Sequence, residues 1–542
     1  MSDVKKVYGI DLGTTYSCVA TIDEFEKPIV LKNGEGDDVT PSVVFYENND
    51  KVIVGDTAKN EIDTERRVAF IKREIGNDHF QSTCIFPEDP VTVSAYILKK
   101  LVQDANESSM QEINDVVITC PAYFGTKERM QTQQAGEIAG LNVLSIINEP
   151  TAAAISYGLT TKQDQVVLVY DLGGGTFDVT VIEVSNAAIR VVATGGDSRL
   201  GGADWDKEIV TYLAAQFEDE TGSSNVISDP ETEANLYLSA EKAKKMLSHK
   251  DSYKTTVVHE GSSAKIELTR ETFESITSTL LNRTVSIMND VLEAAKAKGE
   301  KHTKFDEVLL VGGSCRMPQI KQAVDAALGC NAKMFDPDQA VAKGAAMYAM
   351  FQQEYNFGEI NKNGDDDTTK GSGNRSIGGG DGPKQPDIIN VLSKSYGIGS
   401  VIGDGNTKII STMVFEQDEL PTEASETFVT LAEGQSRMQI DVYEVSATRK
   451  DTITDDGYTF TAVPEADGTH LDGALLDFGK GFPQGHPVEV TIKLDREGMM
   501  DVSAIEKVTG KDIQVQIEIK GVRSKEEVKE AAAKMARIKV EG

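Results

Sequence analysis

Two glycine-containing segments have the residue types expected of a phosphate-binding site. The first reads DLGTTYSCVATI from Asp11 to Ile22, and the second reads DLGGGTFDVTVI from Asp171 to Ile182. Each predicts a strand, a glycine turn and a second strand. Glycines let the backbone approach an anion closely, so that successive N–H groups form a nest, and the threonines add hydroxyl donors. The turn residues are Gly13, Thr14, Thr15, Gly173, Gly174, Gly175 and Thr176.

Aspartates accompany both turns. Asp11, Asp171 and Asp178 would lie beside bound phosphates, where carboxylates require a hard cation, Mg²⁺ with retained waters, to offset the repulsion. One such motif alone is explained equally well as a tight β-turn. The pair favours phosphate binding, and the repetition favours two like lobes that face one cleft, as a duplicated half-domain would produce.

Other candidate nucleotide contacts are weaker on their own. No G-x-x-x-x-G-K-[ST] sequence occurs, so a P-loop is excluded. Gly312 and Gly313 would let a flat adenine ring lie against the backbone, although an ordinary strand-exit turn is the commoner explanation. One face of an expected helix carries a charged set that is also typical of a solvated surface: Glu241, Lys244, Lys245 and Ser248.

The surrounding elements change in character along the chain. From Met1 to about Gln353, apolar strands alternate with helix-like stretches, which indicates an α/β domain. Residues 356–386 contain eight glycines and three consecutive aspartates and predict a flexible linker. Residues 488–494 and 513–519 then alternate with a period of two, which predicts an antiparallel β-domain. A capping box at Ser524 starts a last short helix, expected to run to about Arg537 with nothing after it.

Composition narrows the class of protein. The 542 residues include 55 Lys plus Arg against 87 Asp plus Glu, and the resulting charge of -32 disfavours nucleic acid and anionic membranes as partners. Five scattered cysteines argue against a disulfide framework and a zinc site and favour a reducing compartment. There is no apolar leader and no run long enough to span a membrane, so we expect a soluble, cytoplasmic protein.

Four ordered motifs resemble the ATPase domain of the seventy-kilodalton heat-shock chaperones, the DnaK family. They are GIDLGTTYSCV (9–19), NEPTAAAISYG (148–158), DLGGGTFDV (171–179) and VGGSCRMP (311–318), and the similarity continues in GHPVEVTIKLDREGMMDVSAIEKVTGK (485–511). The resemblance implies an α/β, actin-like two-lobed ATPase domain (1–355) and an interdomain linker (356–390). An antiparallel β-sandwich that binds peptide (391–522) and a short helix (523–542), the remnant of a lid, would follow.

The resemblance also assigns roles within the ATP site. Lys72 would position the attacking water and the γ-phosphate, and Thr176 would hold the γ-phosphate side. Asp11, Glu149 and Asp171 would orient water and hold Mg²⁺ through water. The implied nucleotide contacts are Gly13, Thr14, Thr15, Tyr16, Gly173, Gly174, Gly175, Thr176, Gly202, Glu241, Lys244, Ser248, Gly312, Gly313, Ser314, Arg316 and Asp338.

Peptide binding and coupling are implied in the same way. Pro121 and Arg129 would relay the nucleotide state, and Ile388 and Ile389 would anchor the linker. The expected peptide contacts are Ile398, Val401, Phe428, Leu431, Met438 and Ile440, with Leu431 at the arch. An alternating strand residue such as Ile440 is more often plain sandwich core.

Several departures from the family predict faster peptide exchange, weaker coupling between the domains and weaker ATP binding. Only one helix is available for the lid, so peptide should exchange fast. The linker PDIIN keeps two apolar anchors, which predicts weaker docking and weaker coupling. The segment 76–90 contains fewer residues than the corresponding segment of the family. Lys245 replaces an arginine that stacks on adenine, which predicts weaker ATP binding.

We therefore expect an ATP-dependent molecular chaperone of the heat-shock type that acts in protein folding and the stress response. It would hydrolyse ATP to ADP, bind extended apolar segments of unfolded polypeptides, and work with a J-domain co-chaperone and a nucleotide-exchange factor. The alternatives are a regulator whose bound nucleotide is only structural and a small-molecule kinase on the same ATPase fold. An actin-like filament protein is disfavoured by the acidic surface.

Overall fold

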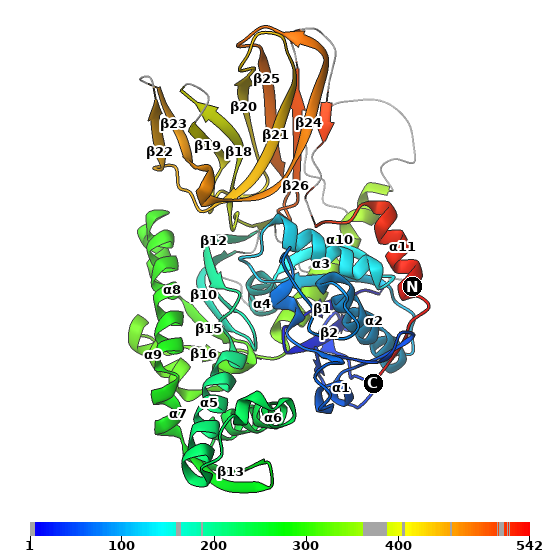
Figure 1. Cartoon of the computed structure of the whole chain (residues 1–542), viewed down its shortest axis with the longest axis vertical. Coiled ribbons are helices and arrows are strands. Elements are labelled where there is room, and N and C mark those ends of the chain that lie inside the picture. Colours follow the sequence, from blue (N-terminus) through cyan, green and yellow to red (C-terminus); the bar gives the residue numbers. More distant parts are fainter. Residues whose placement is uncertain are drawn as a thin grey trace.

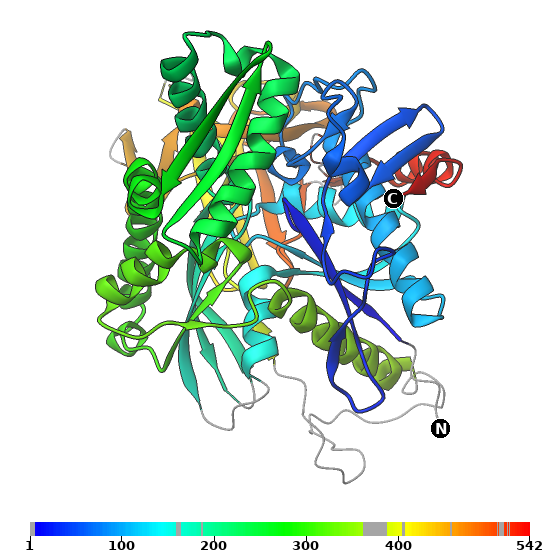
Figure 2. The ribbon, with the colours of Figure 1, turned by 90° about the horizontal axis from the view of Figure 1, so that it is seen from below.

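The computed structural model describes residues 6–158, 164–185, 188–360, 387–403, 407–455, 458–506, 508, 514–516, 519 and 521–542. A β-sandwich lies on top of a two-lobed α/β domain (Figure 1), and the two lobes lie side by side when the molecule is viewed from below (Figure 2). The expected α/β ATPase-type fold with an antiparallel β-sandwich and a C-terminal helix is confirmed. The linker expected between them lies mostly outside the described residues, at 361–386.

Lobe I is built on a sheet in which one hairpin continues into parallel strands. The order is β3 (Pro28–Val30), β2 (Tyr16–Ile22), β1 (Tyr8–Asp11), β8 (Asp115–Cys120) and β9 (Asn142–Asn148), with β4 (Thr40–Pro41) also on β2. β1 is antiparallel to β2 and parallel to β8. Helices α2 (Pro90–Ser109) and α3 (Thr126–Ile138) belong to this lobe, as do the short helix α1 (Asp56–Asn60) and the 3₁₀ turn η1 (Ile71–Glu74).

Lobe II repeats this pattern. Its sheet order is β16 (Lys333–Met334), β15 (Glu307–Val311), β10 (Gln165–Leu172), β11 (Phe177–Val184), β12 (Ala188–Asp197) and β17 (Asp387–Ile389). β10 is antiparallel to β11 and parallel to β15, as β1 is to β2 and β8. The lobe also contains α5 (Gly202–Thr221), α6 (Pro230–Leu247), the hairpin β13 (Ser252–His259) and β14 (Ser262–Thr269), α7 (Arg270–Ile276), α8 (Ser278–Ala297) and α9 (Pro318–Leu328).

Two helices join the lobes at the base of the cleft, α4 (Glu149–Gly158) and α10 (Ala340–Ile360). A Cβ on Gly344 would lie 1.7 Å from the carbonyl oxygen of Ala152, so the two helices touch backbone to backbone. A Cβ on Gly9 would likewise lie 2.0 Å from the amide nitrogen of Ala346. Because no side chain fits at either contact, these glycines allow the close crossing that brings the two hairpins together.

The β-sandwich has two antiparallel sheets around one apolar core. The first sheet contains β22 (Thr452–Asp455), β23 (Tyr458–Pro464), β19 (Thr407–Val414), β18 (Ser395–Ile402), β21 (Gln435–Val445) and β24 (Gly468–Phe482). The second contains β20 (Thr422–Val429), β25 (Pro487–Leu494), β26 (Met500–Ile505) and β27 (Gln514–Gln516). Val488, Val490, Ile492 and Leu494 all point into the core, as their alternation predicted.

The C-terminal segment differs from the expectation of a lone helix. Helix α11 (Lys525–Met535) packs beside α3 of lobe I, and strand β28 (Lys539–Glu541) follows it. β28 pairs in parallel with β6 (Lys51–Val54), which extends the small lobe I sheet that also contains β5 (Val44–Asn48) and β7 (Arg67–Val68). A three-residue strand with one apolar side chain between two charged ones gives little signal in a sequence, because its pairing depends on a partner far away in the chain.

Side chains of the C-terminal segment and of lobe I hold this segment in place. Val528, Met535, Ile538 and Val540 belong to the apolar core of lobe I. The ammonium group of Lys99 donates to the carbonyl oxygens of Met535 at 2.9 Å and Ile538 at 2.8 Å, where the helix ends. The sandwich is therefore connected to the ATPase-type domain at both of its ends. Within the described part of the chain, no helix is long and apolar enough to cross a membrane.

Replacing Val540 with Asp should destabilise lobe I by about 2–4 kcal/mol, because the change removes an apolar contact and buries a charge. The measurement is urea unfolding together with hydrogen exchange of the β6 amides. Lys539→Ala, on the exposed side of the same strand, is the matched control, and its effect should stay below about 0.5 kcal/mol. Equal effects of the two changes would contradict the assigned packing of β28.

Candidate functional site

The two glycine hairpins meet face to face across the cleft. A Cβ on Gly174 would lie 1.9 Å from the hydroxyl of Thr15, and a Cβ on Gly175 would lie 2.1 Å from Cγ2 of Thr14. The turn of lobe I therefore touches the turn of lobe II at positions where only glycine fits. Thr14 is buried, and its hydroxyl has no hydrogen-bond partner among the described residues. A buried hydroxyl of this kind is suited to an acceptor supplied by a ligand.

A cavity of about 840 Å³ opens between the lobes beside these turns. It is large enough for a nucleotide. Gly175 and Gly202 are the expected nucleotide contacts that do not line it; they pack behind Thr14 and Ser314. The expected residues that do line it are Asp11, Gly13, Thr14, Thr15, Tyr16, Lys72, Glu149, Asp171, Gly173, Gly174, Thr176, Glu241, Lys244, Ser248, Gly312, Gly313, Ser314, Arg316 and Asp338.

Carboxylates and one lysine gather at the inner end of the cavity. Lys72 forms a buried ion pair with Glu149, with Asp11 and Asp171 nearby. Burial raises the pKa of Asp11 to about 7, and the Glu149 carboxylate adds to the shift. The pKa of Asp171 is raised well above its usual range for the same two reasons. Burial acts to lower the pKa of Lys72, but the carboxylates of Glu149 and Asp11 outweigh it and raise the pKa.

These charges are unbalanced, since several acids share one lysine in a desolvated cleft. A divalent cation would relieve the repulsion, and carboxylate oxygens are the ligand type that Mg²⁺ accepts. Asp178 is the cross-strand partner of Asp171 in the β10–β11 hairpin, and burial together with the Glu149 and Asp171 carboxylates raises its pKa well above the usual range. It is not among the described residues that line the cavity, and its carboxylate accepts a hydrogen bond from the amide of Ala122 at 3.2 Å. The side chain therefore adds to the buried charge of this group and also supports the segment after β8.

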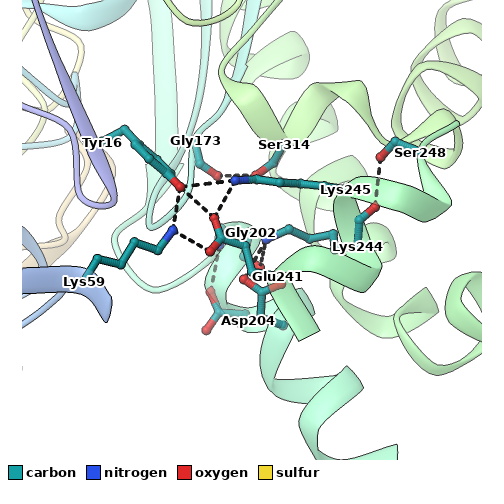
Figure 3. Close-up of polar contacts among 12 residues, drawn as sticks. Tyr16, Lys59, Gly173, Gly202, Asp204, Glu241, Lys244, Lys245, Ser248 and Ser314 are labelled. Carbon is teal, nitrogen blue, oxygen red and sulfur yellow. Dashed lines mark hydrogen bonds and ion pairs between the residues drawn. The ribbon is translucent and has the colours of Figure 1, made fainter. Parts of the chain in front are cut away.

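The opposite end of the cavity is lined from helix α6 and the 3₁₀ turn η4 (Gly313–Arg316). Lys244 donates to the carbonyl oxygen of Gly202 at 2.9 Å and pairs with Asp206 at 2.7 Å. The hydroxyl of Ser314 donates to the carbonyl of Gly173 at 2.8 Å, which ties this end to the lobe II hairpin (Figure 3). Arg316 and Asp338 form an exposed pair at 2.7 Å. Asp206 was not identified from the sequence, because an aspartate in a helical stretch carries no local signal.

Tyr16 and Lys59 of lobe I meet Glu241 and Lys245 of lobe II at the mouth of the cavity (Figure 3). Lys59 donates to the Tyr16 hydroxyl and to Glu241, both at 2.5 Å. Tyr16 donates to Glu241 at 2.9 Å, and Lys245 pairs with Glu241 at 2.8 Å. Sequence reasoning missed Lys59. Lys245, which stands where the family has an arginine that stacks on adenine, lines the cavity and lies over the Tyr16 ring at 5.1 Å.

We call this cluster of Tyr16, Lys59, Glu241 and Lys245 the cleft latch, and its carboxylate stays ionised over a wide range of pH. Burial alone would raise the pKa of Glu241, but Lys59 and Lys245 outweigh it and hold the pKa at about 2. The ordinary pKa of a glutamate is 4.5, and the pKa of Glu241 in the folded protein is lower. The ion pairs of the cleft latch are therefore fully formed above pH 4.5 and are lost only as the pH falls towards the pKa of Glu241.

The linker residues expected to couple the domains lie against lobe II. β17, which contains Ile388 and Ile389, pairs in parallel with β12, so this part of the linker is a strand of the sheet. The adjacent Asn390 is buried, and its side chain contacts Asn148 at 3.5 Å and Thr151 at 3.4 Å. Asn148 directly precedes Glu149 in the sequence, so the linker contacts the side chain of the residue next to the buried acid.

Arg129 occupies the same junction. It is buried and donates to Asn148 at 2.5 Å and to the carbonyl oxygen of Phe124 at 3.0 Å. Thr126, on the same helix, donates to the carbonyl oxygen of Gly498 at 2.9 Å in a loop of the sandwich. Pro121 directly follows β8 and precedes Ala122, whose amide donates to Asp178. The sandwich, the linker and the site acid therefore meet within one set of contacts.

The expected peptide contacts fall into two groups. Ile398 and Ile440 are about 1% exposed and lie in the core of the sandwich. Phe428 and Met438 are half-buried against that core, Val401 is half-buried, and Leu431 is 54% exposed. The exposed and half-buried residues are available to a peptide in this arrangement, whereas Ile398 and Ile440 serve packing.

Comparisons with known proteins agree over nearly the whole chain. The family model described as Hsp70 protein matches residues 7–86, 87–357 and 381–541. Chaperone protein DnaK of Thermosipho melanesiensis is 35% identical over 524 residues, which cover 94% of this chain and 80% of that protein. The DnaK of Thermosipho africanus is 34% identical over 93% of this chain and 79% of its own length. That of Halobacterium salinarum is 36% identical over 95% and 75%.

Replacing Lys59 with Ala should speed release of bound nucleotide about tenfold, because a partly buried, charge-assisted hydrogen bond contributes about 1.5 kcal/mol. Stopped-flow displacement of a fluorescent nucleotide gives the rate. Lys32→Ala, which removes an exposed pair with Asp38 in the same lobe, is the control and should change the rate less than about twofold. Release at the wild-type rate from the Lys59 variant would show that the cleft latch does not hold the lobes closed.

Proposed function

The chain belongs to the Hsp70 family, and from that membership we propose that it is an ATP-dependent molecular chaperone which hydrolyses ATP to ADP. The observation that carries the proposal is the meeting of two glycine hairpins beside a cavity that holds a buried lysine and a set of carboxylates. Both hairpins offer backbone N–H groups and hydroxyls to phosphates, and the acids face the place where those phosphates would end.

The site residues fit a nucleotide with Mg²⁺. Asp11, Glu149 and Asp171 would hold the cation through water, and the cation would neutralise charge on the phosphates. The buried Thr14 hydroxyl, which has no hydrogen-bond partner among the described residues, would donate to a phosphate, and Thr176 lines the same end of the cavity. Lys72, held by its pair with Glu149, would orient the attacking water and stabilise charge that develops on the γ-phosphate.

The sandwich is the proposed peptide-binding unit. An extended apolar segment of an unfolded polypeptide would pair with strand backbone and insert side chains between Phe428, Met438 and Leu431. These residues support the proposal because they combine apolar character with exposure. Ile398 and Ile440 would support the walls of such a site from the core below.

Coupling between the two sites is proposed to run through β17, Asn390, Asn148 and Arg129. These contacts support the proposal because they join the linker and α3 to Asn148, the residue that precedes Glu149. A J-domain co-chaperone and a nucleotide-exchange factor are proposed partners through family membership. We propose a cytoplasmic location on the same ground, and the charge of -32 argues against nucleic acid and anionic membrane as partners.

Lys72→Ala should lower the single-turnover rate of ATP hydrolysis by at least about a hundredfold, because it removes the only buried lysine among the described residues lining the inner end of the cavity. ATP affinity should fall less than about tenfold. Chelation of Mg²⁺ should abolish hydrolysis in the wild type. Lys254→Ala, an exposed change on β13, is the control.

Other outcomes separate the alternatives. A wild-type protein that binds ATP but never hydrolyses it would be a regulator, and the proposed activity would be wrong. ADP formation that depends on an added sugar would instead indicate a small-molecule kinase.

A further inference from the structure

Arg73, the neighbour of Lys72 in η1, reaches across the cleft to lobe II. Its Nε donates to the carbonyl oxygen of Gly175 at 2.7 Å. Its Nη2 and Nη1 donate to the two carboxylate oxygens of Asp204, at 2.5 and 3.3 Å. The side chain is only 15% exposed. A guanidinium fork held at all three nitrogens has one orientation, which a lysine could not reproduce.

The groups that receive Arg73 form a single unit of lobe II. The Asp204 carboxylate also accepts from the amide of Gly201 at 2.8 Å, at the start of α5. The amides of Gly202 and Ala203 donate to the carbonyl oxygens of Gly173 at 3.0 Å and Gly174 at 2.8 Å. The first turn of α5 is therefore bonded to the glycine hairpin, and Arg73 holds both parts at once.

The carbonyl that Arg73 binds belongs to the peptide unit between Gly175 and Thr176. In a trans peptide the N–H points away from the carbonyl oxygen, so fixing the Gly175 oxygen also fixes the direction of the Thr176 N–H. The hydrogen bond polarises this peptide unit as well. Arg73 thus orients the backbone of a residue that lines the phosphate end of the cavity.

The backbone that carries Arg73 is also held in place, on the lobe I side. Ile71 and Ile75, on either side of the Lys72–Arg73 pair, are buried in the core of lobe I. The pair therefore projects from a rigid base into the cleft, where Lys72 bonds Glu149 and Arg73 bonds lobe II. The position of Lys72 relative to the lobe II hairpin is set by its own neighbour.

We propose that Arg73 is a positioning residue for ATP hydrolysis, which ties Lys72 to the phosphate hairpin when the lobes are closed. The proposal rests on the proposed ATPase activity. Arg73 acts through Gly175, Thr176 and Lys72, and Asp204 is the partner that keeps the guanidinium in place. Loss of the tie should therefore slow the chemical step more than it weakens nucleotide binding.

The test compares single-turnover hydrolysis with the equilibrium affinity for ATP, in the full chain with Mg²⁺. Arg73→Ala should lower the hydrolysis rate on the order of ten- to a hundredfold, with the ATP dissociation constant changed less than about threefold. Arg73→Lys should fall between the wild type and Arg73→Ala. Asp204→Asn should add little to Arg73→Ala in the double variant, because both changes weaken the same ion pair while the asparagine oxygen can still accept from the Gly201 amide.

Arg199→Ala is the matched control, since Arg199 also spans the lobes, to Glu74 at 3.5 Å, but its side chain is 65% exposed. It should hydrolyse ATP at the wild-type rate. Thermal unfolding checks each variant, and if Arg73→Ala does not fold, Arg73→Lys and Asp204→Asn carry the same comparison.

Three results would overturn the proposal: a wild-type rate in the Arg73 variants, a loss no greater than that of Arg199→Ala, or a loss of affinity equal to the loss of rate. A wild-type protein without hydrolysis would instead refute the proposed function itself, and the proposal about Arg73 with it.

Discussion

The parallel pairing of β17 with β12 is the constraint on which the arrangement of the domains depends. Three residues of the linker complete the sheet of lobe II through main-chain pairing, and the Ile388 side chain packs against the apolar core beside it. Asn390 then enters the junction between Asn148 and Thr151, and the sandwich loop at Gly498 rests on α3. With α11 and β28 bonded to lobe I at the other end, the sandwich is held from both sides (Figure 1).

The cleft is organised around buried charge. Asp11, Glu149 and Asp171 share one lysine at the inner end of the cavity, and burial together with the neighbouring carboxylates raises the pKa values of the two aspartates. Such an arrangement is costly in a folded protein unless a ligand relieves it. The glycine contacts across the cleft bring two sets of N–H donors together, and the cleft latch and Arg73 close the lobes around them. The same geometry would therefore bind phosphates and concentrate charge where a phosphoryl group reacts.

Local patterns in the sequence predicted the elements but not the contacts between them. The repeated D-L-G hairpins predicted two like lobes because glycine turns and strand periodicity are local properties. Lys59 gave no such signal, since its partner Glu241 lies 182 residues away. The same holds for Arg73 with Asp204 and for β28 with β6. Alternation placed Ile398 and Ile440 on one face of their strands, but it could not tell a face that packs in the core from one that meets a peptide. The apolar pair Ile388 and Ile389 predicted a linker anchor, but the sequence could not show that their backbone also pairs with β12, because that partner strand lies far away in the chain.

The central claim is that the docked linker lets the peptide site and the ATP site communicate. The most direct measurement is the single-turnover rate of ATP hydrolysis with and without an unfolded apolar peptide, in the wild type and in Ile388→Asp. The account predicts that peptide changes the rate several-fold in the wild type, and that the change disappears when a charge at position 388 weakens the pairing of β17. Hydrolysis that ignores peptide in the wild type, or a response that survives in Ile388→Asp, would contradict it.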